Sequence, residues 1–201
     1  MVFKIIAISG NRCAGKDTLF NALQSTTGGN FKRYAFADAL KSDLKELIRE
    51  QFGIDIFNAT GEEKEFVRPI LISYGCVWRE RDVDHWCKKV CAAIDADSTM
   101  VPVITDLRFK NELDVLRREY GSSLYHIHLE RKNNVEPTEE EQKNIHSIDH
   151  LADYKLVWGG NTPEEIASIA QNIVSNSPLK TQHYFFHVTA CHNLVDKKHN
   201  V

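Results

Sequence analysis

Residues 10–18, with the sequence GNRCAGKDT, combine two glycines and a lysine at a spacing that can bind phosphate. Gly10, Gly15 and Lys16 match the pattern G-x-x-x-x-G-K-[ST]. In this pattern the glycines let backbone N–H groups turn toward phosphate oxygens, and the lysine reaches the outer phosphates. An apolar run precedes the loop and a helical pattern follows it, so the positive end of a helix is expected at the same place. The predicted phosphate-binding segment is therefore Gly10, Asn11, Arg12, Cys13, Ala14, Gly15, Lys16, Asp17 and Thr18.

Asp17 stands where the pattern normally has Ser or Thr, whose hydroxyl group holds Mg²⁺. A carboxylate is a harder and more strongly charged oxygen ligand, so Asp17 could bind the metal directly or through water. It could instead accept a hydrogen bond from the molecule that receives the phosphate. Thr18 lies about 100° further around the helix and is not expected to replace it. Asp17 is thus predicted to specialise the loop rather than to break it.

Three more residues complete a predicted catalytic set. Asp106 ends an apolar run, VPVITD, which places a carboxylate at the carboxyl edge of a parallel sheet, where open α/β folds bind ligands. It could hold a metal-bound water or act as a base, or it could only cap the next helix. Arg108 offers a bidentate fork for the charge that develops in phosphoryl transfer. Arg131 begins a long polar segment that could close over ATP as a lid.

The pattern of elements predicts an α/β fold. Strands are expected at 3–9, 31–37, 101–106, 124–130 and 154–158, and helices at 16–25, 38–53, 62–75, 83–95, 110–121 and 162–174. Asp38 is the expected N-cap of the second helix, and Pro69 predicts a kink or a late start in the third. Strands that alternate with helices indicate a parallel sheet of about five strands. One domain, 1–175, would contain the lid at about 131–150, and a C-terminal extension would follow at 176–201.

Composition excludes several other classes. The chain has 201 residues and a net charge of -3, so it lacks the basic surface typical of nucleic-acid binders, and no apolar run is long enough for a membrane span. Five cysteines without a C-x-x-C pair indicate a reducing, cytoplasmic compartment and no disulfides. The tail has a superficially metal-like spacing, but no cysteine pair accompanies it, so a peripheral extension is favoured over a zinc site. The tail residues concerned are His183, His187, Cys191, His192 and His199.

Several stretches together resemble the deoxynucleoside monophosphate kinases of tailed bacteriophages. That family also has Gly-Lys-Asp in its phosphate loop. YAFADALK (34–41) is similar to its Phe-Ala-Asp-x-x-Lys segment, and VRPILISYGCVWRERDVDHW (67–86) to a block that ends in Asp-x-Trp. VITDLRFKNE (103–112) is similar to the signature Asp-x-Arg-Phe-x-Asn-Glu. The resemblance covers roughly residues 3–175, but family members tend to have Gln and Thr where this chain has Ile72 and Cys76.

This resemblance implies a P-loop NTPase fold with three α/β/α layers and a lid, like that of nucleoside monophosphate kinases. It implies transfer of the ATP γ-phosphate to a deoxynucleoside monophosphate with Mg²⁺, in the host cytoplasm if the protein is viral, by a chain that could form a homodimer. The phosphate loop would hold ATP, Asp106 and Arg108 would sit at the transfer site, and Arg131 on the lid. The residues that would face the acceptor are Asp38, Lys41, Arg68 and Arg79. Trp86 could stack on a base, although a tryptophan at helical spacing usually belongs to the core.

Other interpretations remain open. Another small-molecule kinase with a Gly-Lys-Asp loop, of the phosphomevalonate or dephospho-coenzyme A type, would use the same phosphate loop. A nucleotide-binding protein without catalytic activity is a further alternative, made less favourable by the presence of Lys16, Asp17, Asp106 and Arg108. The chain has no Asn-Lys-x-Asp with which a GTPase reads guanine. The stretch TDLRFKNE favours a nucleotide as the acceptor.

Overall fold

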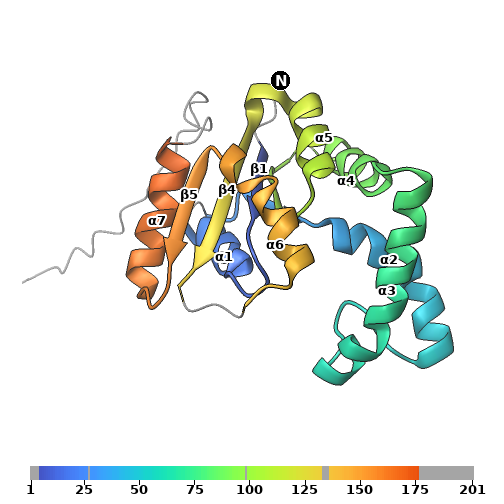
Figure 1. The fold of residues 1–201 in the computed structure, drawn as a ribbon. Coiled ribbons are helices and arrows are strands. Elements are labelled where there is room, and N and C mark those ends of the chain that lie inside the picture. Colours follow the sequence, from blue (N-terminus) through green and yellow to red (C-terminus); the bar gives the residue numbers. More distant parts are fainter. Residues whose placement is uncertain (1–4, 27, 98, 133–135, 177–201) are drawn as a thin grey trace, which may run out of the picture.

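The computed structural model describes residues 5–26, 28–97, 99–132 and 136–176. Five strands form one sheet (Figure 1): β1 (Ile5–Ser9), β2 (Phe31–Tyr34), β3 (Val101–Leu107), β4 (Leu124–Arg131) and β5 (Tyr154–Trp158). The helices are α1 (Lys16–Thr26), α2 (Phe36–Phe52), α3 (Gly61–Arg81), α4 (His85–Asp95), α5 (Lys110–Tyr120), α6 (Glu139–His146) and α7 (Pro163–Asn176). Two short 3₁₀ helices, η1 (Gly121–Ser123) and η2 (Asp149–Leu151), precede β4 and β5.

The sheet has the order β2-β3-β1-β4-β5, and every neighbouring pair is parallel. This confirms the predicted parallel sheet of five strands. Because all strands point the same way, the loops that follow β1, β3 and β4 leave from one edge. The predicted phosphate loop, the segment after Asp106 and the start of the predicted lid therefore meet at that edge.

Helices cover both faces of the sheet, as the three-layer prediction requires. On one face Ile5, Ala7 and Ile104 pack with residues of α4 and α5. On the other face Ile6 and Ile8 pack with residues of α1 and α7. All five residues of β1 are buried, which explains why this strand is a continuous apolar run rather than an alternating one.

Helices α2 and α3 extend away from the sheet as a pair (Figure 1) with a small core of their own. Thr60 and Glu63 form a capping box at the start of α3. The predicted end of this helix at residue 75 is wrong, because α3 continues through Pro69 to Arg81. Val67 packs in the core shared with α2, and we attribute the survival of the helix to this packing, which opposes the cost of the proline.

Two other predictions need correction. Phe36 and Ala37 begin α2 rather than end a strand, so Asp38 lies in the first turn and is not the N-cap. The polar segment 131–150, in which no helix was expected, contains α6 and η2; Thr138 caps α6 through the N–H of Glu141. The C-terminal extension, with its histidines and Cys191, lies outside the described residues apart from its first residue. Among the described helices, none is long and apolar enough to span a bilayer.

Candidate active site

The phosphate loop between β1 and α1 is held against the last two strands of the sheet. Gly10 and Gly15 have φ values of 141° and 93°, which favour glycine. A Cβ at Gly10 would lie 2.2 Å from the carbonyl oxygen of Leu129, and one at Gly15 would lie 2.7 Å from the Trp158 ring. The Trp158 indole N–H also donates to the carbonyl of Ala14 at 2.7 Å. The loop conformation therefore depends on Trp158, which no local pattern in the sequence indicated.

Lys16 lies near three other predicted catalytic residues, Asp17, Asp106 and Arg108. Its ammonium group donates to the carbonyls of Gly10 and Asn11 at 2.8 and 2.9 Å. Burial and then the nearby charge of Arg108 lower the pKa of Lys16, against the opposing effects of Asp106 and Asp17. The charge of Lys16 therefore interacts with Asp17 at the phosphate loop and with Asp106 and Arg108 at the end of β3.

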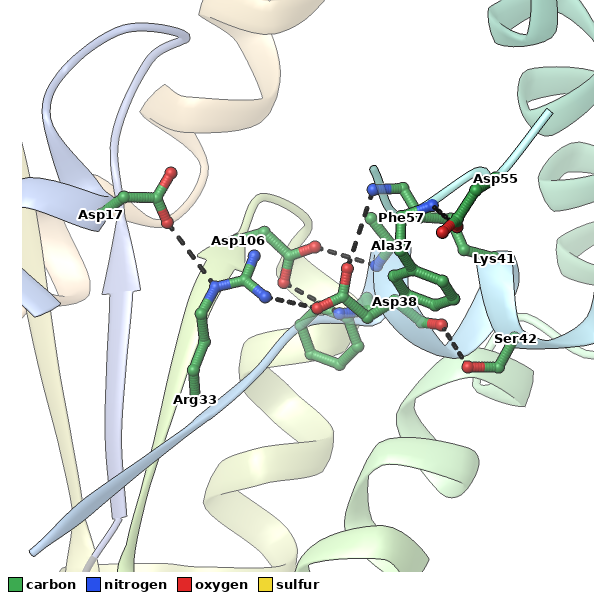
Figure 2. Close-up of polar contacts among 10 residues, drawn as sticks. Asp17, Arg33, Ala37, Asp38, Lys41, Ser42, Asp55, Phe57 and Asp106 are labelled. Atoms are coloured by element: carbon green, nitrogen blue, oxygen red, sulfur yellow. Dashed lines mark hydrogen bonds and ion pairs between the residues drawn. The ribbon is translucent and has the colours of Figure 1, made fainter. Parts of the chain in front are cut away.

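Asp106 connects the sheet to the acceptor side. Its two carboxylate oxygens accept the backbone N–H groups of Phe36 and Ala37, each at 2.9 Å (Figure 2). The predicted alternative that Asp106 caps the next helix, α5, is therefore wrong. Asp106 instead accepts the free N–H groups at the start of α2. Burial raises the pKa of Asp106 despite these hydrogen bonds.

Glu112 caps the start of helix α5. One of its carboxyl oxygens accepts the N–H groups of Arg108 and Phe109 at 2.9 and 3.1 Å, and the residue is 6% exposed. Burial, together with the charge of Asp106, raises the pKa of Glu112 to about 8. The sequence contained Glu112 in the TDLRFKNE stretch, but it gave no reason to expect a buried acid beside the site.

This pKa predicts that the protein loses stability as the pH rises above neutrality. Up to about pH 8 the folded protein keeps a proton on Glu112 that the unfolded chain releases near its ordinary value of 4.5. The folded state therefore binds more protons, and the free energy of unfolding should fall by about 1 kcal/mol between about pH 7 and about pH 8. Burial lowers the pKa values of His126 and His128, so both are mainly neutral in this window. Urea unfolding should show the slope in the wild type and a flatter one in Glu112→Gln.

Glu119→Gln, on an exposed position of the same helix, is the matched control and should retain the wild-type slope. An unchanged slope in Glu112→Gln would show that Glu112 is already ionised at neutral pH. The amide of that variant can still accept both N–H groups, so the comparison isolates the charge from the cap.

A cavity of about 230 Å³ lies between the sheet edge and the α2–α3 pair. It contains the predicted residues Lys41, Arg79, Asp106 and Arg108. The Arg79 guanidinium lies 5.2 Å from the centre of the Phe109 ring, which holds it over the cavity wall. Apolar side chains and one further acid complete the lining: Phe36, Ala37, Leu40, Leu71, Ile72, Trp86, Phe109 and Glu112. Of the five predicted acceptor-side residues, Lys41, Arg79 and Trp86 thus line this cavity, and Asp38 and Arg68 do not.

Three predicted acceptor-side residues stand differently. Trp86 is 3% exposed and donates its indole N–H to the carbonyl of Gly75 at 3.3 Å, so it is mainly a core residue with an edge on the cavity. Arg68 lies on the exposed side of α3, is paired with Glu65 at 2.6 Å and does not line the cavity. Asp38 does not line it either, but its carboxylate lies 3.8 Å from the ammonium of Lys41.

A second cavity, of about 120 Å³, opens on the other side of the phosphate loop. It is lined by Gly15 and Thr18 of the loop, by Arg131, and by residues that follow β5: Trp158, Gly159, Gly160, Asn161 and Ile166. Arg131 also donates a weak hydrogen bond to the carbonyl of Cys13 at 3.4 Å. This cavity therefore adjoins the α1 end of the phosphate loop and has the Arg131 side chain in its lining.

Helix α6, which lies in the predicted lid segment, contacts the phosphate loop directly. Glu141, in the first turn of α6, accepts the backbone N–H of Arg12 at 2.8 Å. This carboxylate brings negative charge to a loop suited to phosphate. Glu141→Gln is therefore expected to tighten ATP binding about threefold, because the variant removes a like charge from the phosphate site. Isothermal titration calorimetry with Mg·ATP measures this directly.

The neighbouring Glu140→Gln, which removes an exposed charge from the same turn, is the control and should bind ATP as the wild type does. Weaker binding by Glu141→Gln would mean that Glu141 supports the closed lid rather than competing with phosphate.

The carboxylates of the site fit a magnesium ion that arrives with a nucleotide. Within the described part of the chain, no three His, Cys, Asp or Glu side chains form a metal cage. In kinase sites Mg²⁺ is held by one or two carboxylates together with substrate phosphates and water. Asp17, 79% exposed at the start of α1, and Asp106 both lie close enough to Lys16 to affect its pKa. Both could therefore supply an oxygen donor to such an ion.

The fold and the phosphate loop are those of the P-loop class: a parallel sheet between two layers of helices, with a Gly-Lys loop between its first strand and first helix. The family model of phosphomevalonate kinase matches residues 8–122, more than half of the chain. The chain belongs to the phosphomevalonate kinase family. It is 27% identical over 121 residues to "Phosphomevalonate kinase" of Drosophila melanogaster, an alignment that covers 60% of this chain and 63% of the relative. The chain thus matches somewhat less than two thirds of that relative's length.

Solved structures of small-molecule kinases are similar at low sequence identity. A sugar kinase from Janibacter sp. HTCC2649 aligns with a TM-score of 0.48 and 18% identity over 90% of this chain and 99% of its own. Dephospho-CoA kinase from Campylobacter jejuni aligns with a TM-score of 0.48 and 10% identity over 85% and 95% of the two chains. Shikimate kinase from Aquifex aeolicus aligns with a TM-score of 0.44 and 16% identity, also over 85% and 95%.

Proposed function

We propose that this protein transfers the γ-phosphate of ATP to the phosphate group of a small phosphorylated acid, with phosphomevalonate as the first candidate. The observation that carries the proposal is the acceptor cavity, in which Lys41, Arg79 and Arg108 gather positive charge. Of these three, Arg108 lies close enough to Lys16 to lower its pKa. The family match supports the same acceptor. The proposal favours the phosphomevalonate alternative over the deoxynucleotide that the motifs resembled.

The chemistry of the cavity lining distinguishes these two acceptors. Phosphomevalonate has a carboxylate and a phosphate on a short, branched aliphatic chain. The cations suit its charged groups, and Leu40, Leu71 and Ile72 suit its methyl and methylene groups. Among the described residues that line the cavity there is no Ser, Thr, Asn or Gln that could hydrogen-bond the edge of a base. A deoxynucleoside monophosphate therefore remains the second candidate, favoured by the TDLRFKNE stretch.

The reaction needs positioning and charge stabilisation more than covalent chemistry. The loop N–H groups and Lys16 hold the donor phosphates, while Arg108 and Arg131 stabilise the charge on the transferred group. An acceptor phosphate is already ionised near neutral pH, so its oxygen attacks without a strong base. A bound Mg²⁺ would neutralise part of the donor charge, and Asp17 and Asp106 would orient it.

A coupled ATP assay with the full chain tests the proposal. Phosphomevalonate should be turned over with a kcat/KM of about 10⁴ M⁻¹s⁻¹ or more, and Lys16→Met should abolish the signal. The panel includes dTMP, dGMP, dAMP, dCMP and dephospho-coenzyme A. Turnover of a deoxynucleotide without phosphomevalonate would replace the first candidate with the second. ATP binding without turnover of any acceptor would contradict the kinase activity itself.

A further inference from the structure

Arg33, on the edge strand β2, lies between the phosphate loop and the start of α2. It belongs to none of the motifs found in the sequence. Its Nε lies 3.6 Å from a carboxylate oxygen of Asp17, at the phosphate loop. Its Nη1 donates to the carboxylate of Asp38, in the first turn of α2. Figure 2 shows the guanidinium between these two acids, with Asp106 beside it. Burial alone would lower the pKa of Arg33, but the carboxylates of Asp38, Asp17 and Asp106 have the larger combined effect and raise it. The guanidinium therefore lies in a strongly negative environment.

Asp38 carries this connection on to the acceptor cavity. One of its carboxylate oxygens binds Arg33, and the other lies 3.8 Å from the ammonium of Lys41. Lys41 lines the cavity, whereas Arg33 and Asp38 do not. Lys41 also lies 5.6 Å from the centre of the Phe57 ring, which limits its position on the other side. A chain of charges therefore runs from Asp17 through Arg33 and Asp38 to Lys41.

This series of ion pairs from Asp17 to Lys41 is more important for the positions of its side chains than for the stability of the protein. Arg33 is 38% exposed, and single pairs at such exposure contribute little to stability. However, a guanidinium can bind two carboxylates at once in a fixed geometry, which an ammonium on a flexible stem does less well. Asp17 is also the carboxylate that would turn toward a nucleotide-bound cation. Arg33 and that cation consequently compete for the same side chain.

We propose that Arg33 is a positioning residue that couples the phosphate loop to the acceptor cavity: it holds Lys41 in place through Asp38 and restrains Asp17 until the nucleotide and its metal bind. The acceptor half of this inference rests on the proposed function, and the nucleotide half does not. Removing Arg33 should have opposite effects on the two sides. Cation binding should tighten because a competing positive charge is lost, and acceptor binding should weaken because Lys41 is no longer held.

The nucleotide half is tested without turnover, by the Mg²⁺ dependence of binding of a fluorescent ADP analogue. Arg33→Gln should lower the Mg²⁺ concentration for half-maximal binding about threefold. Arg33→Lys, which retains the charge, should resemble the wild type. Arg49→Gln is the matched control, since Arg49 is an exposed arginine of α2 that pairs with Glu46 away from the site. An unchanged Mg²⁺ requirement in Arg33→Gln would overturn the inference.

The acceptor half is tested by a double-mutant cycle on phosphomevalonate kinetics. Arg33→Gln and Asp38→Asn should each raise the KM for phosphomevalonate about tenfold, with kcat changed much less. The double variant should be no worse than either single variant, because both remove the same support of Lys41. Arg33→Lys should leave the KM raised, since it keeps the charge but not the double contact.

The outcomes separate this inference from the proposed function. Additive effects in the cycle, or equal losses in the KM for ATP and for the acceptor, would overturn the role of Arg33. A wild-type protein that ignores phosphomevalonate would overturn the proposed function, and the Mg²⁺ measurement would then decide the role of Arg33 alone. Thermal unfolding of each variant excludes a general loss of folding as the cause.

Discussion

Lys16→Met is expected to lower kcat by about a thousandfold or more, because it removes the loop lysine that we propose to contact the donor phosphates. In the structure the Lys16 ammonium is held by the carbonyls of Gly10 and Asn11, both inside the loop. Its position is thus fixed before any phosphate arrives. Methionine has a similar length and fills the same space, so the variant deletes the charge with little change in packing.

The measurement is kcat with saturating ATP and acceptor, together with circular dichroism and thermal unfolding. Lys110→Met is the control: Lys110 pairs with Asp114 on the surface of α5, and its loss should leave kcat unchanged. Lys16→Met with more than about a tenth of the wild-type rate would contradict the assignment, since a residue that stabilises the transferred charge contributes far more than that. A Lys16→Met variant that is folded but inactive would support the assignment of the activity to the phosphate loop.

The sequence predicted those parts of the fold in which local pattern and tertiary packing agree. The buried run of β1, the glycine spacing and the helical period after Lys16 all gave the observed element. The prediction failed where long-range contacts decide. Helix α3 passes through Pro69 because its inner side packs on α2. In helix α6 the buried residue is Ile145. A single apolar position gives no helical period, so the sequence did not predict this helix.

The same distinction applies to the site. Lys16, Asp106 and Arg108 could be placed at one edge of the sheet because each lies at or after the carboxyl end of a strand within a recognisable motif. Trp158, Glu141 and Arg33 act on residues that are distant in the chain or belong to another element, so their neighbours in sequence say nothing of their roles. Asp106 shows the limit of local reasoning. The sequence correctly placed it at the sheet edge, but the alternative that it caps the next helix, α5, is wrong because its hydrogen bonds go to α2.

Asp106→Asn is expected to lower kcat by about a hundredfold and to reduce the free energy of unfolding by about 1–3 kcal/mol. An asparagine retains one carbonyl oxygen, so one of the N–H groups of Phe36 and Ala37 would face an NH₂ group in place of an acceptor. The start of α2 would lose part of its cap. The variant also removes the negative charge that lies near Lys16 and Arg108 and that would orient the metal.

The two effects can be separated by their sizes. A protein of ordinary stability that loses a few kcal/mol of unfolding free energy remains almost entirely folded, so the lost cap alone cannot reduce the rate a hundredfold. Urea unfolding and kcat measured on the same sample therefore assign each role. Asp114→Asn, on the exposed side of α5, is the control for both. If Asp106→Asn were destabilised but kept the wild-type kcat, Asp106 would serve only to begin α2, and Asp17 would be the carboxylate left to orient the metal.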